Sequence, residues 1–257
     1  TNIQLPALAF SGQPITVTWT LTNNGTADFT GTFSDRLSLS GDAQIGSDTF
    51  IAEVPFTGAL AINQTVQRSH TFTLDRNLSG IRWAVVFTDI SGNVLEFPNE
   101  GNNAAISAQP TNVTLQFSDL TVEAVSAPAT AQSGDPIQVI WRVRNQGTLP
   151  TDVTSWVDQI VVSADAILDA SDTTRFNITH TGALAIDAAY TGQGTVTLPQ
   201  GISGDFFIFV QTDVHGQIFE SSSENNNSGR TATPTAVALK PYPDFQVTTV
   251  TGPTAAQ

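Results

Sequence analysis

Residues 15–21 read Ile-Thr-Val-Thr-Trp-Thr-Leu, and residues 137–143 read Ile-Gln-Val-Ile-Trp-Arg-Val. In both stretches an apolar residue stands at every second position, and the fifth residue is a tryptophan, Trp19 or Trp141. Such period-two alternation is typical of a β-strand that buries one face. Each stretch is followed by an Asn-x-Gly turn at 23–25 or 145–147, where Asn and Gly tolerate positive φ. The sequence therefore predicts the same strand and turn twice.

The chain around these strands repeats itself over a long period. Residues 11–15, Ser-Gly-Gln-Pro-Ile, recur as Ser-Gly-Asp-Pro-Ile at 133–137, and the hexapeptide 57–62 recurs letter for letter at 181–186. Asp119-Leu120 is echoed by Asp244-Phe245. The period far exceeds that of a solenoid unit, so each copy is expected to be a domain of its own. We expect a first domain at 1–110 with a truncated leading strand, a second at 118–235, and the opening strand of a third copy at 244–257.

Further strands are predicted as matched pairs, and no helical periodicity is present. An Asp-x-x-Gly turn is expected to fold residues 93–97, and likewise 217–221, back as a hairpin on the preceding apolar strand. Pro-bearing linkers are expected at 108–118 and 233–243. The fold class is therefore all-β, with tandem Ig-like (fibronectin-III-like) β-sandwiches of about seven strands each. The other predicted strands are 36–40 and 159–163, 70–74 and 194–198, 81–88 and 205–212, and 119–125.

Composition narrows the classes of function. The 257 residues contain 9 Lys and Arg against 23 Asp and Glu, a formal charge of −14, which repels phosphate backbones and anionic lipid. Only 12% of residues are charged while 40% are hydrophobic, unlike a disordered acidic tail. Cysteine is absent, so there is no disulfide framework, and no 18-residue apolar run is present that could insert into a membrane. We expect neither nucleic-acid binding nor membrane insertion of this segment.

Several short motifs occur in the same order in both copies. They are Ser-Gly-x-Pro-Ile, an Asp-x-x-Gly-x-x-x-Glu stretch as at 213–220, and a closing Glu-Asn-Asn-Asn at 224–227, with Glu-Gly-Asn-Asn at 100–103. Copy two also has an opening Asp-Leu at 119–120. This pattern resembles the CARDB family, the cell-adhesion-related domain found in bacteria. The resemblance covers both copies and the fragment of the third. It implies an Ig-like sandwich within long bacterial surface or secreted proteins, and it implies no defined ligand.

Acidic residues gather in matched loops of the two copies. Calcium takes six to eight oxygen ligands, often loop carboxylates and carbonyls, so we expect these loops to be candidate calcium sites. The spacing is not that of an EF-hand, and the alternative is that the acids form turns and keep the protein soluble. The candidate ligands are Asp165, Asp169, Asp172, Asp213, Glu220 and Glu224 in copy two, and Asp42, Asp48, Asp89, Glu96 and Glu100 in copy one.

The remaining chemistry-bearing residues favour packing over catalysis. His70, His180 and His215 do not recur between the copies, and with no cysteine a catalytic triad or a zinc site is not expected. We therefore predict that the chain is not an enzyme. Phe33 and Trp156 occupy matched positions and are expected in the core, with a rim position for a glycan or a partner as the alternative.

The leading hypothesis is a non-catalytic adhesion or spacer module at the bacterial cell surface or outside the cell, with calcium as a candidate ligand that would stiffen it. Its expected partners are other copies of the domain in an array and a protein or glycan at the cell surface. One alternative is a structural subunit of an extracellular filament, joined through sheet edges or a donated strand. Another is a carbohydrate-binding accessory domain of a secreted enzyme, with Trp156 as a contact.

Overall fold

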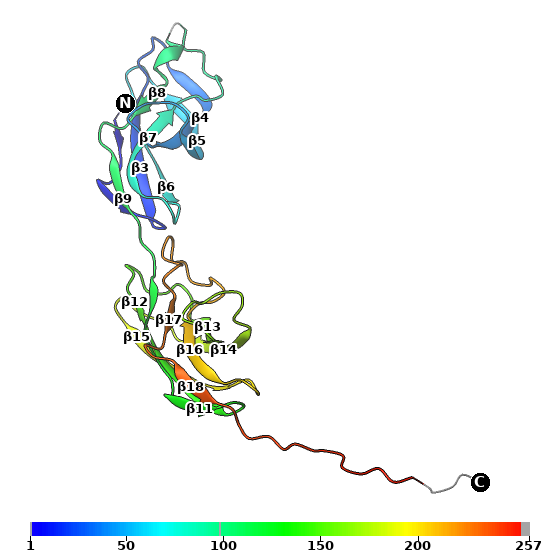
Figure 1. Cartoon of the computed structure of the whole chain (residues 1–257). Coiled ribbons are helices and arrows are strands. Elements are labelled where there is room, and N and C mark those ends of the chain that lie inside the picture. Colours follow the sequence, from blue (N-terminus) through cyan, green and yellow to red (C-terminus); the bar gives the residue numbers. More distant parts are fainter. Residues whose placement is uncertain (1, 98, 253–257) are drawn as a thin grey trace, which may run out of the picture. The chain divides into compact units, whose positions relative to one another are not determined.

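The computed structural model describes residues 2–97 and 99–252, and the chain divides into two compact units, Thr1–Gln116 and Phe117–Gln257. Figure 1 shows each unit as a sandwich of β-sheets. The predicted fold class, tandem all-β sandwiches, is confirmed. The division between the units falls at the bond between Gln116 and Phe117.

The strands of unit one form two sheets in which most pairings are antiparallel. One sheet has the order β1-β3-β6, and the other has the order β2-β9-β7-β4-β5 with the short β8 also paired to β7. The pairing of β2 with β9 is parallel, and the other pairings of the unit are antiparallel. The elements are β1 Ile3–Gln4, β2 Leu8–Phe10, β3 Pro14–Thr22, β4 Phe29–Ser40, β5 Thr49–Leu60, β6 Thr65–Thr73, β7 Gly80–Phe87, the 3-10 turn η1 Glu100–Asn102, β8 Ala104–Ile106 and β9 Thr111–Thr114.

Unit two has the same strand order, so each of its strands has a counterpart in unit one. Its sheets run β10-β12-β15 and β11-β18-β16-β13-β14, with β17 paired to β16, and its one parallel pair among the described residues is β11 with β18. About seven strands were predicted for each unit, and residues 2–97 and 99–252 form nine in each because very short strands are included. The strands are β10 Leu120–Ser126, β11 Thr130–Gln132, β12 Pro136–Asn145, β13 Ser155–Ser163, β14 Thr174–Thr181, β15 Ala189–Thr197, β16 Gly204–Gln211, β17 Ser228–Arg230 and β18 Thr235–Ala238.

The alternating stretches at residues 15–21 and 137–143 lie in β3 and β12, and their apolar faces lie between the sheets. Trp19 is 0% exposed and Trp141 is 1% exposed, each within the main core cluster of its unit. Apolar side chains buried to this degree contribute roughly 1.5–3 kcal/mol each, so these strands anchor the sandwich. Trp156 is also fully buried, and Phe33 is 7% exposed. The alternative of a rim position for these two aromatics, and with it a glycan contact at Trp156, is therefore wrong.

The expected hairpins at 93–97 and 217–221 are not formed. The Asp-x-x-Gly turns exist, but the aspartate side chains bind the next backbone N–H groups and lead the chain into a loop. The strand that returns along β7 is Ala104–Ile106, and the strand that returns along β16 is Ser228–Arg230. A carboxylate that accepts local N–H groups competes with the sheet ladder for them.

The expected linkers also contain strands. Residues 111–114 and 235–238 form β9 and β18, which bury Val113 and Val237 and pair with β7 and β16. Their alternating Thr-x-Val-x pattern explains this outcome, because it supplies one buried face in spite of the nearby prolines.

The opening strand expected for a third copy is not formed in residues 244–252, and residues 253–257 lie outside the described part of the chain. In unit two the corresponding strand, β10, takes its hydrogen bonds from β12, which follows it in sequence. The sequence given has no counterpart of β12 after residue 244.

Candidate functional site

The acidic loops after β4 and β13 use their carboxylates to hold turns. Asp42 accepts the backbone N–H of Gln44 at 2.9 Å, and Asp165 accepts that of Ile167 at 2.8 Å. Asp48 accepts the N–H of Gly46 at 3.1 Å. Asp42 and Asp165 form Asx-type turns, in which the side chain replaces a backbone acceptor, whereas Asp48 binds the N–H of a residue that precedes it.

The other two acids of the loop after β13 act in the same way. Asp172 accepts the N–H of Asp169 at 3.0 Å. Asp169 in turn accepts the hydroxyl and the N–H of Ser171, each at 2.7 Å, and these bonds lower the pKa of the Asp169 carboxyl.

Asp89 and Asp213 have matching roles after β7 and β16. Each adopts positive φ, 47° and 46°, and each accepts two successive N–H groups at 2.8–2.9 Å. Asp213 is 3% exposed, and burial raises the pKa of its carboxyl. These two residues form the bends that replace the expected hairpins.

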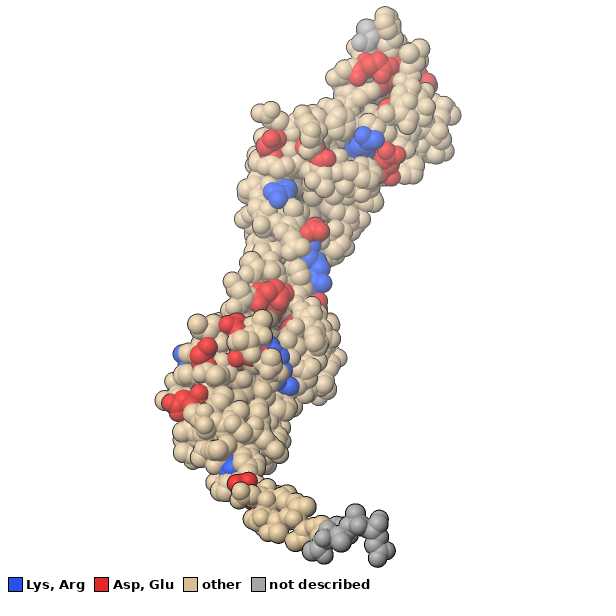
Figure 2. Space-filling view, turned by 45° about the vertical axis from the view of Figure 1, so that its right-hand side comes forward, with Lys and Arg blue, Asp and Glu red and all other residues tan. Residues whose placement is uncertain are grey.

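Across residues 2–97 and 99–252, no group of three or more His, Asp or Glu side chains is placed so that it could hold a metal ion. The face in Figure 2 shows acidic groups in separate places over both units. Calcium needs six to eight oxygens, and the turn carboxylates above are already bonded to backbone N–H groups. These acids are therefore spread over separate turns in the described residues, and calcium binding by the loops stays a prediction.

Glu220 and the asparagine pair have a different partner, which is the opening strand of their own sandwich. Glu220 is fully buried and accepts the N–H of Leu120, and it also accepts the side-chain amide of Asn227. Asn226 donates to the Asp119 carboxylate at 2.8 Å. Burial raises the pKa of Glu220 to about 7. The motifs Asp-Leu, Glu and Asn-Asn are therefore parts of one contact.

The turn after β12 completes this contact from the other side. The N–H of Asp119 donates to the side chain of Asn145 at 3.0 Å, and its carbonyl accepts the N–H of Gln146 at 2.7 Å. We call the set of receiving groups the opening-strand site. In unit two its residues are Asn145, Gln146, Glu220, Asn226 and Asn227.

Glu224 of unit two is exposed and lies outside this set. In unit one the equivalent acids keep part of the arrangement. Glu96 accepts the side-chain amide of Asn103, and Glu100 accepts the N–H of Glu96 at 2.8 Å.

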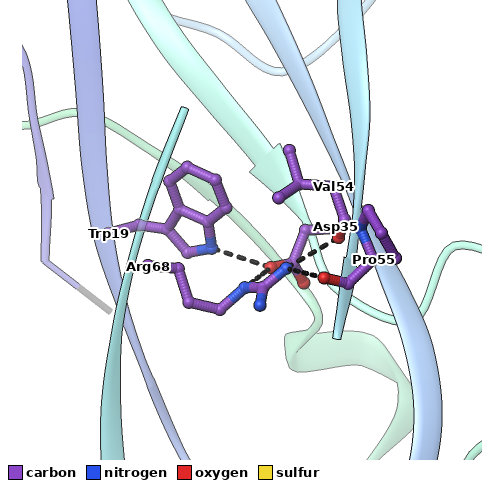
Figure 3. A network of polar contacts seen from close by, with 5 residues as sticks. All are labelled: Trp19, Asp35, Val54, Pro55 and Arg68. Carbon is purple, nitrogen blue, oxygen red and sulfur yellow. Dashed lines mark hydrogen bonds and ion pairs between the residues drawn. The ribbon is translucent and has the colours of Figure 1, made fainter. Parts of the chain in front are cut away.

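A second buried polar contact, which the sequence reasoning missed, joins the sheets of unit one. Asp35 of β4 is 0% exposed and accepts the indole N–H of Trp19 at 2.9 Å and the Nε of Arg68 at 2.6 Å. The Arg68 guanidinium also donates to the carbonyls of Val54 and Pro55 (Figure 3). A buried carboxylate requires such pairing, because taking a charge out of water is costly.

Unit two keeps the Trp–Asp pair but replaces the cation by neutral donors. Asp158 accepts Trp141 Nε1 at 2.7 Å, the Tyr190 hydroxyl at 2.6 Å and the Thr212 hydroxyl at 2.8 Å. Burial and the nearby carboxylate raise the pKa of the Tyr190 hydroxyl above its ordinary value. On β15 the residue that pairs with Trp141 is Gly192, whereas on the equivalent strand β6 the residue that pairs with Trp19 is Arg68.

The histidines lie in different surroundings. His70 lies on β6 of unit one, 6.2 Å from the ring of Phe72. His180 packs its ring 4.0 Å from Trp156 and 3.8 Å from Tyr190, and His215 lies exposed in the loop after Asp213. Each is placed by packing or by a surface turn. Among the described residues the structure has no helix with the length and hydrophobicity that a membrane span requires.

The fold and these contacts define a class, the all-β sandwich module with a hydrogen-bonded opening strand. Neither a family model nor a curated protein matches the sequence. Similar solved structures include the CARDB domain of a Pyrococcus furiosus protein, crystallised in complex with di-metal ions, at 20% identity; it covers 49% of this chain and 99% of that chain with a TM-score of 0.35. A solution NMR structure of that domain is 23% identical over 49% and 100% of the two chains, with a TM-score of 0.34.

Red sea bream transglutaminase is also similar, at 14% identity over 93% of this chain and 32% of that chain, with a TM-score of 0.32. Likenesses at these values carry no function to this chain.

Proposed function

We propose that this chain is a non-catalytic spacer or adhesion module of a bacterial surface or secreted protein, in which successive sandwiches are joined stiffly. The observation that carries the proposal is hydrogen bonding on both sides of the bond between Gln116 and Phe117, where the units meet in sequence. Because these hydrogen bonds hold the backbone of each unit up to this bond, few backbone torsions at the junction are free to rotate.

On the unit-one side, Ser11 holds the departing chain. This serine is 2% exposed, and its hydroxyl accepts the N–H of Gln116 at 2.9 Å, while its own N–H donates to Thr114 at 3.0 Å. Ser133 has the same role in unit two, where its hydroxyl accepts the N–H of Lys240 at 3.0 Å. Each such bond contributes about 1 kcal/mol.

On the unit-two side, the turn after β12 holds the entering chain. The N–H of Phe117 donates to the Thr148 hydroxyl at 3.2 Å, and its carbonyl accepts the N–H groups of Thr148 and Leu149 at 2.8 and 3.1 Å. A Cβ at Gly147 would lie 2.4 Å from that carbonyl oxygen, so only glycine permits the approach. The repeated Asn-x-Gly turn therefore serves as the entry clamp of the domain.

The proposed partners are other copies of the domain in an array and a protein or glycan at the cell surface. Stiffness in this proposal comes from hydrogen bonds at each entry and exit. Calcium binding by the acidic loops stays a prediction, and the stiffness proposed here does not depend on it. The excess of acidic over basic residues favours solubility in an exposed array.

The test is a distance distribution between two spin labels, one in each unit. The chain has no cysteine, so Gln67→Cys on β6 and Thr195→Cys on β15, both at exposed positions, label selectively. We expect a narrow distribution for the parent chain and at least a doubling of its width in the double variant Ser11→Ala/Thr148→Val. Ser133→Ala is the matched control, because its clamp holds the chain after unit two, and it is expected to leave the width unchanged. A parent distribution as broad as that of the double variant would refute the proposal.

A further inference from the structure

A pocket of about 490 Å³ lies on unit one over the strands β4, β5 and β7 (Figure 1). Its volume is within the range of about 300–1,000 Å³ that is typical of small-molecule sites. Arg36 of β4 lies between Phe87 of β7 and Glu53 of β5, because it pairs with both across the sheet. The lining includes Arg36, Ser38, Phe50, Glu53 and Phe87 from the strands and Asp48 from the loop after β4.

A β-bulge places Phe50 beside this pocket. The register of β4 and β5 shifts between Leu37 and Ser38, so Phe50 pairs with Ser38 and Ile51 is an extra residue of β5. Bulges re-aim side chains and are frequent next to functional sites. Phe50 is 57% exposed, and the guanidinium of Arg36 lies 5.9 Å from the centre of its ring. An apolar ring and a cation therefore share one side of the pocket.

The polar side chains of the pocket retain unused hydrogen-bonding capacity. Arg36 donates to Glu53 at 3.2 Å, and its Nε has no hydrogen-bond partner among residues 2–97 and 99–252. One oxygen of the Asp48 carboxylate accepts the N–H of Gly46 at 3.1 Å. A guanidinium has five N–H donors and a carboxylate has two acceptor oxygens, so both groups can bind a further partner. The pocket therefore offers donors and acceptors next to an aromatic ring.

Unit two bridges the corresponding place with a side chain of its own. In the register of β13 and β14, the counterparts of Arg36 and Phe50 are Gln159 and Arg175. Arg175 donates to the side chain of Gln159 at 2.9 Å and to the carbonyl of Asp172, in the loop after β13, at 2.7 Å. It thus ties the sheet to the loop. Phe50 has no donor with which to make these bonds, so the same place in unit one stays open.

The chemistry of the pocket fits a sugar ring. Each hydroxyl of a sugar can donate to a carboxylate and accept from a guanidinium, and the C–H face of a pyranose can pack on an aromatic ring. Charge favours a neutral sugar. An anion would compete with Glu53 for Arg36 and would lie near Asp48, whereas a cation would lie near Arg36. A neutral ligand leaves the pair of Arg36 and Glu53 in place.

We propose that unit one binds a neutral pyranose glycan in this pocket, with the sugar ring on Phe50 and its hydroxyls bonded to Arg36, Asp48 and Glu53. This inference rests on the function proposed above, since it names a glycan among the partners of an adhesion module. It gives the two units different tasks. Unit one holds the ligand, and unit two, whose pocket is bridged by Arg175, acts as the spacer.

The experiment is a titration of the isotope-labelled full chain, followed by two-dimensional NMR in the presence of EDTA. The probes are the methyl pyranosides of glucose, galactose, mannose and N-acetylglucosamine, each added up to about 50 mM. We expect saturable shifts of the amide signals of Ser38, Phe50 and Phe87 with at least one probe, with a Kd in the millimolar range. The amide signals of Gln159 and Arg175 in unit two should not move.

Two variants and a matched control test the role of the ring and of the acid. Phe50→Arg introduces the residue that bridges the pocket of unit two and should weaken binding at least tenfold. Glu53→Gln keeps the size of the side chain, removes an acceptor charge and should weaken binding at least threefold. Phe10→Arg is the control, because it makes the same change at another exposed phenylalanine of unit one, on β2, and should leave the Kd unchanged. The melting temperature of each variant reports whether unit one is folded.

The proposal is overturned if no probe gives a saturable shift, or if folded Phe50→Arg and Glu53→Gln bind as tightly as the parent. Equal weakening by Phe10→Arg would also overturn it. Shifts of these amides with calcium alone, and none with the pyranosides, would identify a cation site in its place. None of these outcomes changes the distance distribution between the spin labels, so a failure of the glycan site is distinguishable from a failure of the stiff junction.

Discussion

Replacing Arg68 by methionine tests whether the buried Asp35 carboxylate is held by its ion pair. Methionine keeps much of the aliphatic stem of arginine and removes the guanidinium, which lies over the rings of Trp19 and Phe56. Asp35 then has only the indole N–H of Trp19, and its second oxygen has no hydrogen-bond partner in the structure. Removing one partner of a buried ion pair costs about 3–5 kcal/mol, because it leaves a desolvated charge.

The expected effect on unit one is large and local. For a unit of this size, 1 kcal/mol lowers the melting temperature by about 4 °C, so Arg68→Met should lower that of unit one by about 12–20 °C. Differential scanning calorimetry of the whole chain measures this, with the transition of unit two as an internal reference that stays in place. Adding Asp35→Asn removes the buried charge and should restore roughly half of the loss. A fall of less than about 4 °C, or no rescue by the asparagine, would refute the assignment of the ion pair.

Three further predictions concern unit two. Tyr190→Phe removes one of three neutral donors to Asp158 and should cost about 1.5–3 kcal/mol of unfolding free energy, measured by urea titration; no loss would mean that Trp141 and Thr212 suffice. Gly147→Ala should destabilise unit two by about 2–3 kcal/mol through its clash with Phe117, whereas Gly25→Ala should cost unit one less than 1 kcal/mol; equal costs in calorimetry would contradict the close approach. Burial raises the pKa of Glu220 from 4.5 to about 7, so the folded unit retains a proton that the unfolded chain has released between these values. The stabilisation by this proton is complete below pH 4.5 and is lost as the pH rises to about 7, by up to about 3 kcal/mol. Thermal melts from pH 4 to 8 should show this fall in the stability of unit two, and Glu220→Gln should flatten the pH dependence. A parent chain whose unit two gains stability over this range would contradict the prediction.

The strand skeleton could be predicted where residues alternate strictly. The faces of β3 and β12 follow directly from the apolar parity of residues 15–21 and 137–143. The same alternation is present in β4 and β13, where Phe33, Asp35 and Leu37 stand at every second position, as do Trp156, Asp158 and Ile160. An aspartate in phase with core residues points inward, but its partner lies on another strand, so the sequence alone could not supply it.

The roles of the acidic motifs, in contrast, could not be predicted from the sequence. The pattern of Asp, Glu and Asn residues was visible, but an acidic residue is written the same way in the sequence whether its carboxylate binds calcium, holds a turn or binds a strand. Only the fold reveals that Asp119 and Asn226, more than a hundred positions apart, are hydrogen-bonded to each other. The prolines near β9 and β18 led to the prediction of linkers at 108–118 and 233–243. They flank the two strands and do not interrupt the residues that pair.

The parallel pairs β2–β9 and β11–β18 determine how a unit responds to mechanical tension. Each joins a strand near the start of its unit to one near its end, as in the register of Leu8 with Asn112 and Phe10 with Thr114. When a pull along the chain reaches two parallel strands from opposite ends, it slides one past the other, so the hydrogen bonds between them share the load and must break together. An antiparallel hairpin pulled at its open ends would instead unzip one bond at a time.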